Sequence, residues 1–399
     1  MLRRVLLAVF LILLATAARA ADPLIVISID GFRADYLDRG VTPALATLAR
    51  EGVRAAMRPS FPALTYPNHY TLVTGLRPDQ HGVVDNEMWD ETIGQRFTMS
   101  ARTAEDPRWW EGAKPLWTSA EEQKTGTAVA GWPGSEKYLF GRRPRYLDPW
   151  REGRTAGETV AVILNWLDLP AAFRPSLLLG YAAEIDHDGH LFGPDSPEMT
   201  AALGKLDAAI AALAAGLKAR GLYDRVNLVL VSDHGMTATP PGQYTVIDRL
   251  VPPSLGMVRS SGSGAGIEPL PGREAEVAAL LLKQHPHFTC WRKGEMPPRL
   301  RYGSHARVPP FYCQNQPGWR FRTARQVADG ARENPGNHGF DSGHPHMQAL
   351  FLARGPAFRR NVRLAPFDNV DVYPLLAHLA GVRPEPNEGR LSTFRPSLK

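Results

Sequence analysis

The sequence predicts an α/β protein: a three-layer α/β/α sandwich with a mostly parallel central sheet. Three continuous apolar runs carry this prediction, at 24–29, 176–181 and 227–232. They lack the apolar–polar alternation of a half-exposed strand, and such runs are typical of parallel strands buried on both faces. Stretches of helical periodicity separate the runs, and this alternation of strands and helices favours helices on both faces of one sheet.

The remaining elements follow in chain order. Helical patterns cover 42–51, 158–167 and 197–220, and apolar residues at 346–352 indicate a late strand. A closing helix is expected at about 370–379, with Asn369 as its N-cap, because asparagine accepts hydrogen bonds from the first free backbone amides. No internal repeat or linker interrupts 21–399, so we expect a single domain.

One segment departs from this pattern. Residues from about 252 to 326 are rich in Pro, Gly, Arg and aromatic side chains and show little periodicity. We therefore expect an irregular insertion there.

The first twenty residues resemble an export signal. Arg3 and Arg4 precede an apolar stretch from Val5 to Leu14, and Ala18–Ala20 fits a small-residue cleavage site. A membrane anchor is the alternative, but a span needs about 20 apolar residues. We expect cleavage after residue 20, no membrane anchor in the mature chain, and an exported protein, secreted or in a bacterial periplasm. The absence of an Asn-x-Ser/Thr sequon fits a periplasm.

The net charge does not indicate a polyanionic partner. Three arginines of the signal segment account for half of the formal charge of +6, which leaves +3 for the mature chain. The other basic residues are scattered, as on an ordinary solvated surface. We expect no stable nucleic-acid partner, and the sequence assigns no oligomeric state.

The chain has two cysteines, Cys290 and Cys313. Export to an oxidising compartment favours a disulfide between them, with two buried thiols as the alternative.

Possible metal ligands follow all three apolar runs. Asp30 follows the first run, Asp186 and His190 follow the second, and Asp233-His234 follows the third. Ligands bind beyond the carboxyl ends of strands in such sheets. Asp186 and His190 would share one face of a helix, although a loop is equally compatible. From the sequence alone, the adjacent His187 and Asp188 compete for the same role.

Three further histidines, His338, His344 and His346, lie close together, and their spacing does not choose among them. Each imidazole alone is more simply a surface or core residue, but the joint pattern favours a metal site. Carboxylates and imidazoles without thiolates suit Zn²⁺ better than Mg²⁺ or Ca²⁺. The five residues after the apolar runs and one of these three histidines make six ligands. Six ligands exceed one tetrahedral shell, which indicates two metal ions and the chemistry of phosphoryl transfer.

At this point the chain resembles a known family. The motifs are Phe61–Tyr70, Val73–Leu76, Pro78, His81-Gly82, Asp85-Asn86, Trp132–Ser135, Asp186–His190, Asp233–Gly235, His338–Asp341 and Pro366–Asn369. Together they closely resemble the nucleotide pyrophosphatase/phosphodiesterase family of the alkaline phosphatase superfamily. The resemblance covers essentially the whole mature chain and is least in the insertion.

The resemblance implies a role for each site residue. Thr65 matches the nucleophile, which forms a phosphoryl-threonine intermediate, and Asn86 matches the donor to a non-bridging phosphoryl oxygen. The implied cofactors are two Zn²⁺ ions: one held by Asp30, Thr65, Asp233 and His234, the other by Asp186, His190 and His338. His187 and Asp188 stand where the family has small residues. A threonine hydroxyl needs a base or metal to act as a nucleophile, which agrees with this assignment.

Aromatic residues near these motifs suggest the substrate. By resemblance, Tyr66, which follows the nucleophile, stacks on a nucleobase; Tyr181 and Tyr146 are further candidates for substrate contact, with core packing as the alternative. Stacking tolerates any base. The expected partner is a small phosphodiester, a nucleotide with loose base preference.

Four other functions have sequence requirements that can be compared with this chain. A phosphomonoesterase of the same superfamily has a Lys-x-Arg pair near the position of Trp132, and this chain has none in that region. A choline-phosphate or lysophospholipid phosphodiesterase shares the ligand set, so the ligands do not exclude it. A sulfatase is disfavoured because neither cysteine lies in a Cys-x-Pro-x-Arg context. A zinc-binding protein with a dead site would have lost the nucleophile or a ligand, and every position is filled.

Overall fold

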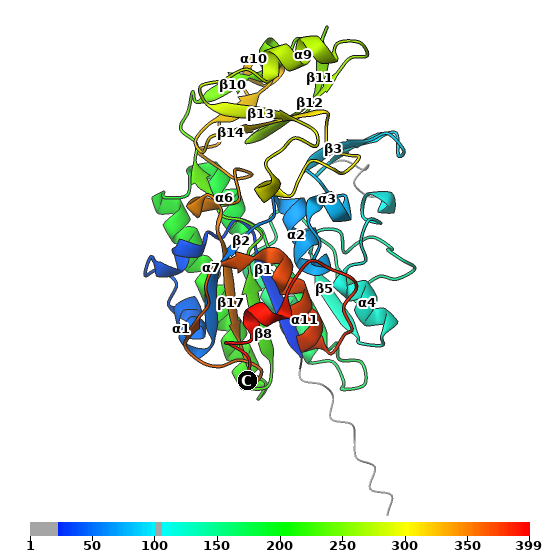
Figure 1. Ribbon diagram of the computed structural model, residues 1–399. Helices are drawn as coiled ribbons and strands as arrows, with labels where there is room; N and C mark the ends of the chain where they lie inside the picture. The colour runs from blue at the N-terminus through cyan, green and yellow to red at the C-terminus, as the bar shows by residue number, and fades with distance from the viewer. Residues whose placement is uncertain (1–22, 100–105) are drawn as a thin grey trace, which may run out of the picture.

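The computed structural model describes residues 23–99 and 106–399, so the predicted signal peptide lies outside the described residues. A nine-stranded sheet forms the centre of the molecule (Figure 1). Its strand order is β18-β2-β17-β8-β1-β7-β5-β6, with β19 beside β2. The strands are β1 Leu24–Ile29, β2 Val53–Arg58, β5 Thr127–Ala130, β6 Tyr146–Asp148, β7 Leu177–Ala182, β8 Asn227–Val231, β17 Ala349–Arg354, β18 Val362–Arg363 and β19 Phe367–Asp368.

The central strands are buried on both faces, as the apolar runs predicted. All six residues of β1 are buried. Leu24 and Val26 contribute to one hydrophobic core, whereas Ile25, Ile27 and Ile29 contribute to the other. Side chains of a strand alternate between the two faces, so apolar residues occupy successive positions. The buried polar residue of β1, Ser28, lies 2.9 Å from His69 Nε2. The three-layer prediction is confirmed.

The sheet is parallel except at β17, which runs antiparallel to both of its neighbours. β1 pairs in parallel with β7 on one side and β8 on the other. In this register Ile29 lies opposite Ala182, and Ser28 lies opposite Val231. The three strands therefore end at the same edge of the sheet, which we call the carboxyl edge.

Helices cover both faces (Figure 1). On the face of Ile25 and Ile27 they are α1 Pro43–Glu51, α5 Ala156–Leu167, α6 Glu184–Phe192 and α7 Pro197–Ala219; on the other they are α2 Thr65–Thr74, α3 Pro78–His81, α4 Leu116–Glu122 and α11 Val372–Ala380. The helices predicted at 42–51, 158–167 and 197–220 match α1, α5 and α7 within two residues.

Helix α7 is long and apolar enough, by length and composition, to cross a membrane. Nine of its residues are buried, among them Leu203, Leu206 and Ile210 of the hydrophobic core. It packs beside α1, α5 and α6. We therefore interpret α7 as a core helix.

The C-terminal part corrects two predictions. Strand β17 starts at Ala349, because 345–347 form a 3-10 turn before it. Asn369 does not cap the closing helix; it belongs to a 3-10 turn, and α11 starts at Val372. Its side chain instead donates to Asn68 Oδ1 (2.8 Å) and accepts from the Ser60 hydroxyl (2.8 Å). These tertiary hydrogen bonds outweigh the local capping preference.

The prediction of an irregular insertion at 252–326 is wrong. The segment contains a four-stranded antiparallel sheet, which we call the small sheet, in the order β11-β12-β14-β13. Its strands are β11 Gly256–Ser260, β12 Gly264–Pro269, β13 Phe288–Arg292 and β14 Phe311–Asn315, and helix α9 covers Glu274–Leu281. The strands are short, and β11 is irregular between Val258 and Ser260, so no long periodic run marks them.

The small sheet lies beyond the carboxyl edge of the central sheet (Figure 1). Cys290 of β13 and Cys313 of β14 pair across the sheet and form the predicted disulfide. Short elements surround the small sheet and the carboxyl edge: the hairpin of β3 Glu87–Asp90 and β4 Gln95–Thr98, the pairs β9 Thr237–Ala238 with β16 Gly336–Asn337 and β10 Tyr244–Val246 with β15 Arg320–Arg322, and helices α8 Ile247–Leu250 and α10 Ala324–Ala328.

Candidate active site at the carboxyl edge

Two clusters of possible metal ligands lie at the carboxyl edge. The first, which we call the buried group, contains Asp30 directly after β1 and Asp233 and His234 just after β8. All three residues are at most 1% exposed. His234 Nε2 lies 2.9 Å from Asp233 Oδ2 and 3.4 Å from Asp30 Oδ1. The parallel register places these residues together, as expected from the strand ends.

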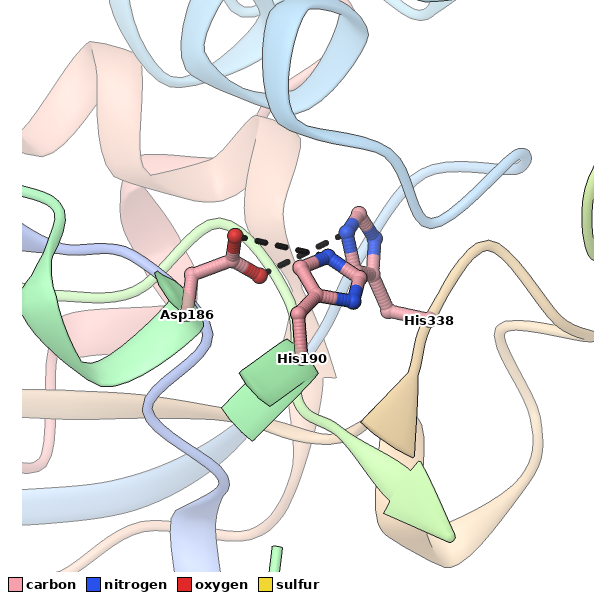
Figure 2. Close-up of side chains that lie close together, drawn as sticks. All are labelled: Asp186, His190 and His338. Carbon is pink, nitrogen blue, oxygen red and sulfur yellow. Dashed lines mark ion pairs between the residues drawn. The ribbon is translucent and has the colours of Figure 1, made fainter. Parts of the chain in front are cut away.

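The second cluster, the outer group, contains Asp186, His190 and His338 (Figure 2). Asp186 and His190 lie on one face of helix α6. The sequence was compatible with a helix or a loop at these residues, and the structure has the helix. Asp186 Oδ2 lies 3.5 Å from His190 Nε2, and Asp186 Oδ1 lies 3.4 Å from His338 Nε2. Asp186 and His190 are partly exposed, unlike the buried group.

Of the competing residues, His338 is the histidine that joins the outer group. His346 lies elsewhere, with its Nδ1 3.0 Å from the Thr237 hydroxyl, and its ring contacts His344 edge-on. Among the described residues, neither metal group includes His187 or Asp188.

The backbone fixes the orientation of all three imidazoles. The Nδ1 atoms of His190, His234 and His338 each lie 2.9 Å from a carbonyl oxygen: those of Gly336, Gly235 and Ala63. A carbonyl only accepts, so each Nδ1 carries the proton in the neutral ring and each Nε2 directs its lone pair at the carboxylates. Burial, with the neighbouring His234, lowers the pKa of His338 to about 3. Metal-binding histidines are held in this way.

The residues fit divalent metal ions. Asp30 Oδ1, Asp186 Oδ1 and Asp233 Oδ2 are buried and accept no hydrogen bond. Burial, together with the charges of Asp233 and Asp186, raises the pKa of Asp30 well above its ordinary value. For Asp233 burial acts in the same direction, but His234 and His69 outweigh it and lower the pKa. Buried carboxylate oxygens and imidazole lone pairs that face one another need cations between them.

The two groups adjoin. The rings of His234 and His338 stack with their centroids 3.6 Å apart. Gly31, directly after Asp30, permits this approach: a Cβ atom there would lie 2.9 Å from the Cα atom of Asp186, and the residue has φ +68°. Both the space and the left-handed conformation require glycine. The two groups therefore form one continuous site.

Thr65 lies beside the buried group. It is the first residue of α2, is 7% exposed, and its Oγ1 lies 3.3 Å from His234 Nε2. The next backbone amide, that of Tyr66, donates to Asn86 Oδ1 (3.0 Å), which holds the Asn86 side chain near the start of the helix. A helix N-terminus stabilises negative charge. The arrangement offers a hydroxyl nucleophile, metal ligands and hydrogen-bond donors for a phosphoryl group.

Comparison with known proteins agrees with this chemistry. Residues 24–341 match the model of the type I phosphodiesterase/nucleotide pyrophosphatase family. The chain belongs to this family. It is therefore a hydrolase with the α/β fold of the family.

Relatives are found among curated proteins and solved structures. An uncharacterized pyrophosphatase/phosphodiesterase of Schizosaccharomyces pombe is 37% identical over 378 residues, which cover 92% of the chain and 78% of that protein. Ectonucleotide pyrophosphatase/phosphodiesterase family member 3 of Bos taurus is 33% identical, but the chain spans only 44% of its length.

The structure of murine ectonucleotide pyrophosphatase/phosphodiesterase 5 superimposes on this chain with a TM-score of 0.90 at 32% sequence identity. The match covers 94% of this chain and 100% of the murine chain. An inactive form of the murine protein, with a threonine replaced by alanine, matches equally well and was solved in complex with AMP.

The structure separates the three tyrosines of this phosphodiesterase. The Tyr66 ring is half-buried against Phe97 and Trp110 at the start of α2, and burial raises its pKa to about 12. Tyr181 is buried in β7, and its hydroxyl donates to Asp30 Oδ2 (2.5 Å). This hydrogen bond orients Asp30, a candidate metal ligand. The sequence had suggested that Tyr181 faces the substrate, whereas the structure directs its hydroxyl at Asp30.

Tyr146, predicted from the sequence as a possible substrate contact, lies away from both metal groups. It pairs with Ala128, which pairs with Leu178, and Leu178 in turn pairs with Ile25. Ile25 lies four residues before the end of β1, so Tyr146 is about 13 Å from the carboxyl edge along the strands. Its hydroxyl donates to the carbonyl oxygen of Phe173. Parallel pairing placed the residue at the opposite end of the sheet, which its position in the sequence did not indicate.

One buried residue near the reacting groups was not singled out from the sequence. His69 lies one helical turn after Thr65 and contacts the Thr65 carbonyl oxygen and Asp233. Two features of the sequence could have identified His69. It belongs to the Phe61–Tyr70 motif, and it lies four residues after Thr65, a spacing that places both side chains on one face of a helix.

Proposed function

We propose that the protein is an exported two-zinc nucleotide phosphodiesterase/pyrophosphatase that acts through Thr65. The observation that supports this most directly is the position of Thr65 Oγ1, 3.3 Å from His234 Nε2 and next to a buried cluster of unpaired carboxylate oxygens. Zn²⁺ suits the carboxylate and imidazole donors. Asp30, Thr65, Asp233 and His234 would hold one ion, and Asp186, His190 and His338 the other.

Bound zinc would lower the pKa of the Thr65 hydroxyl and stabilise the charge on the leaving oxygen. The Thr65 oxygen attacks phosphorus, forming a phosphorus–Oγ1 bond, and the bond from phosphorus to the leaving oxygen breaks. Water then cleaves the phosphoryl-threonine and restores the hydroxyl. The Asn86 side chain, positioned by the Tyr66 amide, donates to a non-bridging phosphoryl oxygen in both steps.

A nucleotide is the proposed substrate. The half-buried Tyr66 ring follows the nucleophile and offers a surface for a base, and stacking on an aromatic ring contributes about 1–3 kcal/mol for any base. The AMP complex of the murine relative supports this choice.

Export is supported by the disulfide between Cys290 and Cys313 and by the ectoenzyme names of the relatives. Disulfides persist in oxidising compartments. The proposed location is outside the cell or in a bacterial periplasm.

Rates on three chromogenic substrates test the function. The mature protein is assayed with a nitrophenyl ester of a nucleotide, nitrophenyl phosphate and nitrophenyl phosphorylcholine, each with and without a chelator and after zinc is restored. We expect the nucleotide ester to react fastest, the chelator to abolish the reaction and zinc to restore it.

Each other outcome contradicts a defined part of the proposal. Fastest hydrolysis of nitrophenyl phosphate would indicate a phosphomonoesterase, and fastest hydrolysis of the choline ester would indicate a lipid or choline-phosphate substrate. Bound zinc without turnover of any substrate would indicate a dead site.

A further inference from the structure

His69 contacts Thr65, Asp233 and Ser28, which belong to three different parts of the site. It is the fifth residue of α2 and is fully buried. Its Nδ1 lies 2.9 Å from the carbonyl oxygen of Thr65 and 3.4 Å from Asp233 Oδ2, and its Nε2 lies 2.9 Å from the Ser28 hydroxyl of β1. One side chain thus connects the nucleophile, a predicted metal ligand and the central strand.

These contacts determine which nitrogen carries the proton. The carbonyl oxygen of Thr65 can only accept a hydrogen bond, so His69 Nδ1 is the donor. In the neutral ring Nε2 then accepts from the Ser28 hydroxyl. The same Nδ1–H faces Asp233 Oδ2, an oxygen that accepts no other hydrogen bond.

Aromatic neighbours restrict movement of the ring. Tyr181 contacts it edge-on with centroids 5.0 Å apart, and Trp132 does so at 5.3 Å. The Trp132 indole N–H also donates to the His69 carbonyl oxygen (3.3 Å). Tyr181 in turn donates to Asp30, so the two rings in contact each direct a donor at a carboxylate of the buried group.

We propose that His69 is a positioning residue, which aligns the Thr65 nucleophile with the buried group through one shared N–H. The inference rests on the proposed metal centre. Hydrogen bonds from the protein to metal ligands orient the ligands and increase metal affinity. His69 contacts Asp233 of the buried group, so we expect a change at His69 to affect the metal of that group most.

Three substitutions test whether His69 acts through its Nδ1–H donor or only by filling space in the core. Asparagine at position 69 places an N–H donor near the position of Nδ1, glutamine places its amide near Nε2, and phenylalanine keeps a ring without donors. We expect His69→Gln and His69→Phe to lower kcat about 10–100-fold and to weaken one of two bound metals by a similar factor. We expect KM to change little and His69→Asn to recover most of both properties.

Zinc content, chelator competition for each metal, steady-state kinetics and thermal melting are measured on the folded, zinc-loaded variants. Ser28→Ala serves as the matched control for the Nε2 side, and we expect a smaller loss than for His69→Gln. Equal losses for His69→Asn and His69→Gln would overturn the proposal, as would wild-type kcat and metal affinity in His69→Phe. If His69→Phe does not fold, the comparison of His69→Asn with His69→Gln tests the proposal. A wild-type protein without zinc or turnover would instead contradict the proposed function.

Discussion

The two metal groups differ in how the fold supports them. In the buried group the side chains are at most 2% exposed, two ligands follow β8 and one follows β1, and Tyr181 and His69 direct donors at the carboxylates. In the outer group Asp186 is 18% and His190 25% exposed, and backbone carbonyls orient His190 and His338. Backbone groups support the buried group as well, through the Gly235 carbonyl oxygen at His234 and the Gly31 amide at Asp233, so the side-chain donors are its additional support. The Thr65 hydroxyl lies 3.3 Å from His234 Nε2 of the buried group.

This difference indicates a division of labour. A rigid, water-excluded group suits activation of the nucleophile, because fixed charges act most strongly where solvent does not reorganise. An accessible group suits the oxygen that leaves and the water that enters. Four predictions test this division, in order of decreasing effect.

Thr65→Ala should have the largest effect. Removal of the hydroxyl eliminates the attacking atom but leaves Asp30, Asp233 and His234 in place, so turnover should fall at least about 10⁴-fold while both metals stay bound. Activity and zinc content are measured on the same preparation. Substantial remaining activity would exclude Thr65 as the nucleophile, and loss of zinc would show that its oxygen is an essential ligand.

Asp233→Asn and Asp186→Asn compare the groups directly. The first substitution removes a charge that solvent cannot replace, and we expect kcat/KM to fall about 1,000-fold. At the partly exposed Asp186 water can supply an oxygen ligand, so about 100-fold is expected. Thermal melting checks that both variants fold. A larger loss for Asp186→Asn would reverse the proposed division.

Metal removal should occur in two phases. Release from the buried group needs local opening of the strand ends, so we expect one equivalent of zinc to leave at least ~10-fold more slowly than the other. A zinc indicator follows release during incubation with a chelator. Samples taken after the first phase should regain activity with one added equivalent of zinc. Release of both ions in a single phase would show that burial does not distinguish the groups.

Tyr181→Phe and Tyr146→Phe should have the smallest effects. Phenylalanine at 181 removes the hydroxyl that donates to Asp30, and a loss of about tenfold in kcat is expected. Tyr146 lies away from the carboxyl edge, so its variant should keep wild-type kinetics and serves as the control. A raised KM for the nucleotide ester in Tyr146→Phe would restore the substrate contact that the sequence suggested.

The sequence predicted those features that depend on local pattern. Five of the six residues of Leu24–Ile29 are apolar because both faces of β1 are covered, and that pattern is visible without coordinates. The ends of such strands located Asp30 and Asp233. The Phe61–Tyr70 motif identified Thr65, which as an isolated threonine would not have been noticed.

Features that depend on pairing between distant segments were not predictable. The small sheet combines short strands from 256 to 315, and the positions of Tyr146 and Tyr181 depend on strand register. Asn369 bonds to residues about three hundred positions away. His338 was distinguished from His344 and His346 by resemblance, and in space by the Ala63 carbonyl oxygen that orients its ring.

Gly31 determines how closely the two metal groups approach, and its backbone amide donates to Asp233 Oδ1 (3.2 Å). Because its Cα hydrogen faces the backbone of Asp186, even a methyl group there would separate β1 from α6 and the buried group from the outer group. The spacing of the two metal groups is therefore determined by the direct approach of two backbones, with no side chain of residue 31 between them.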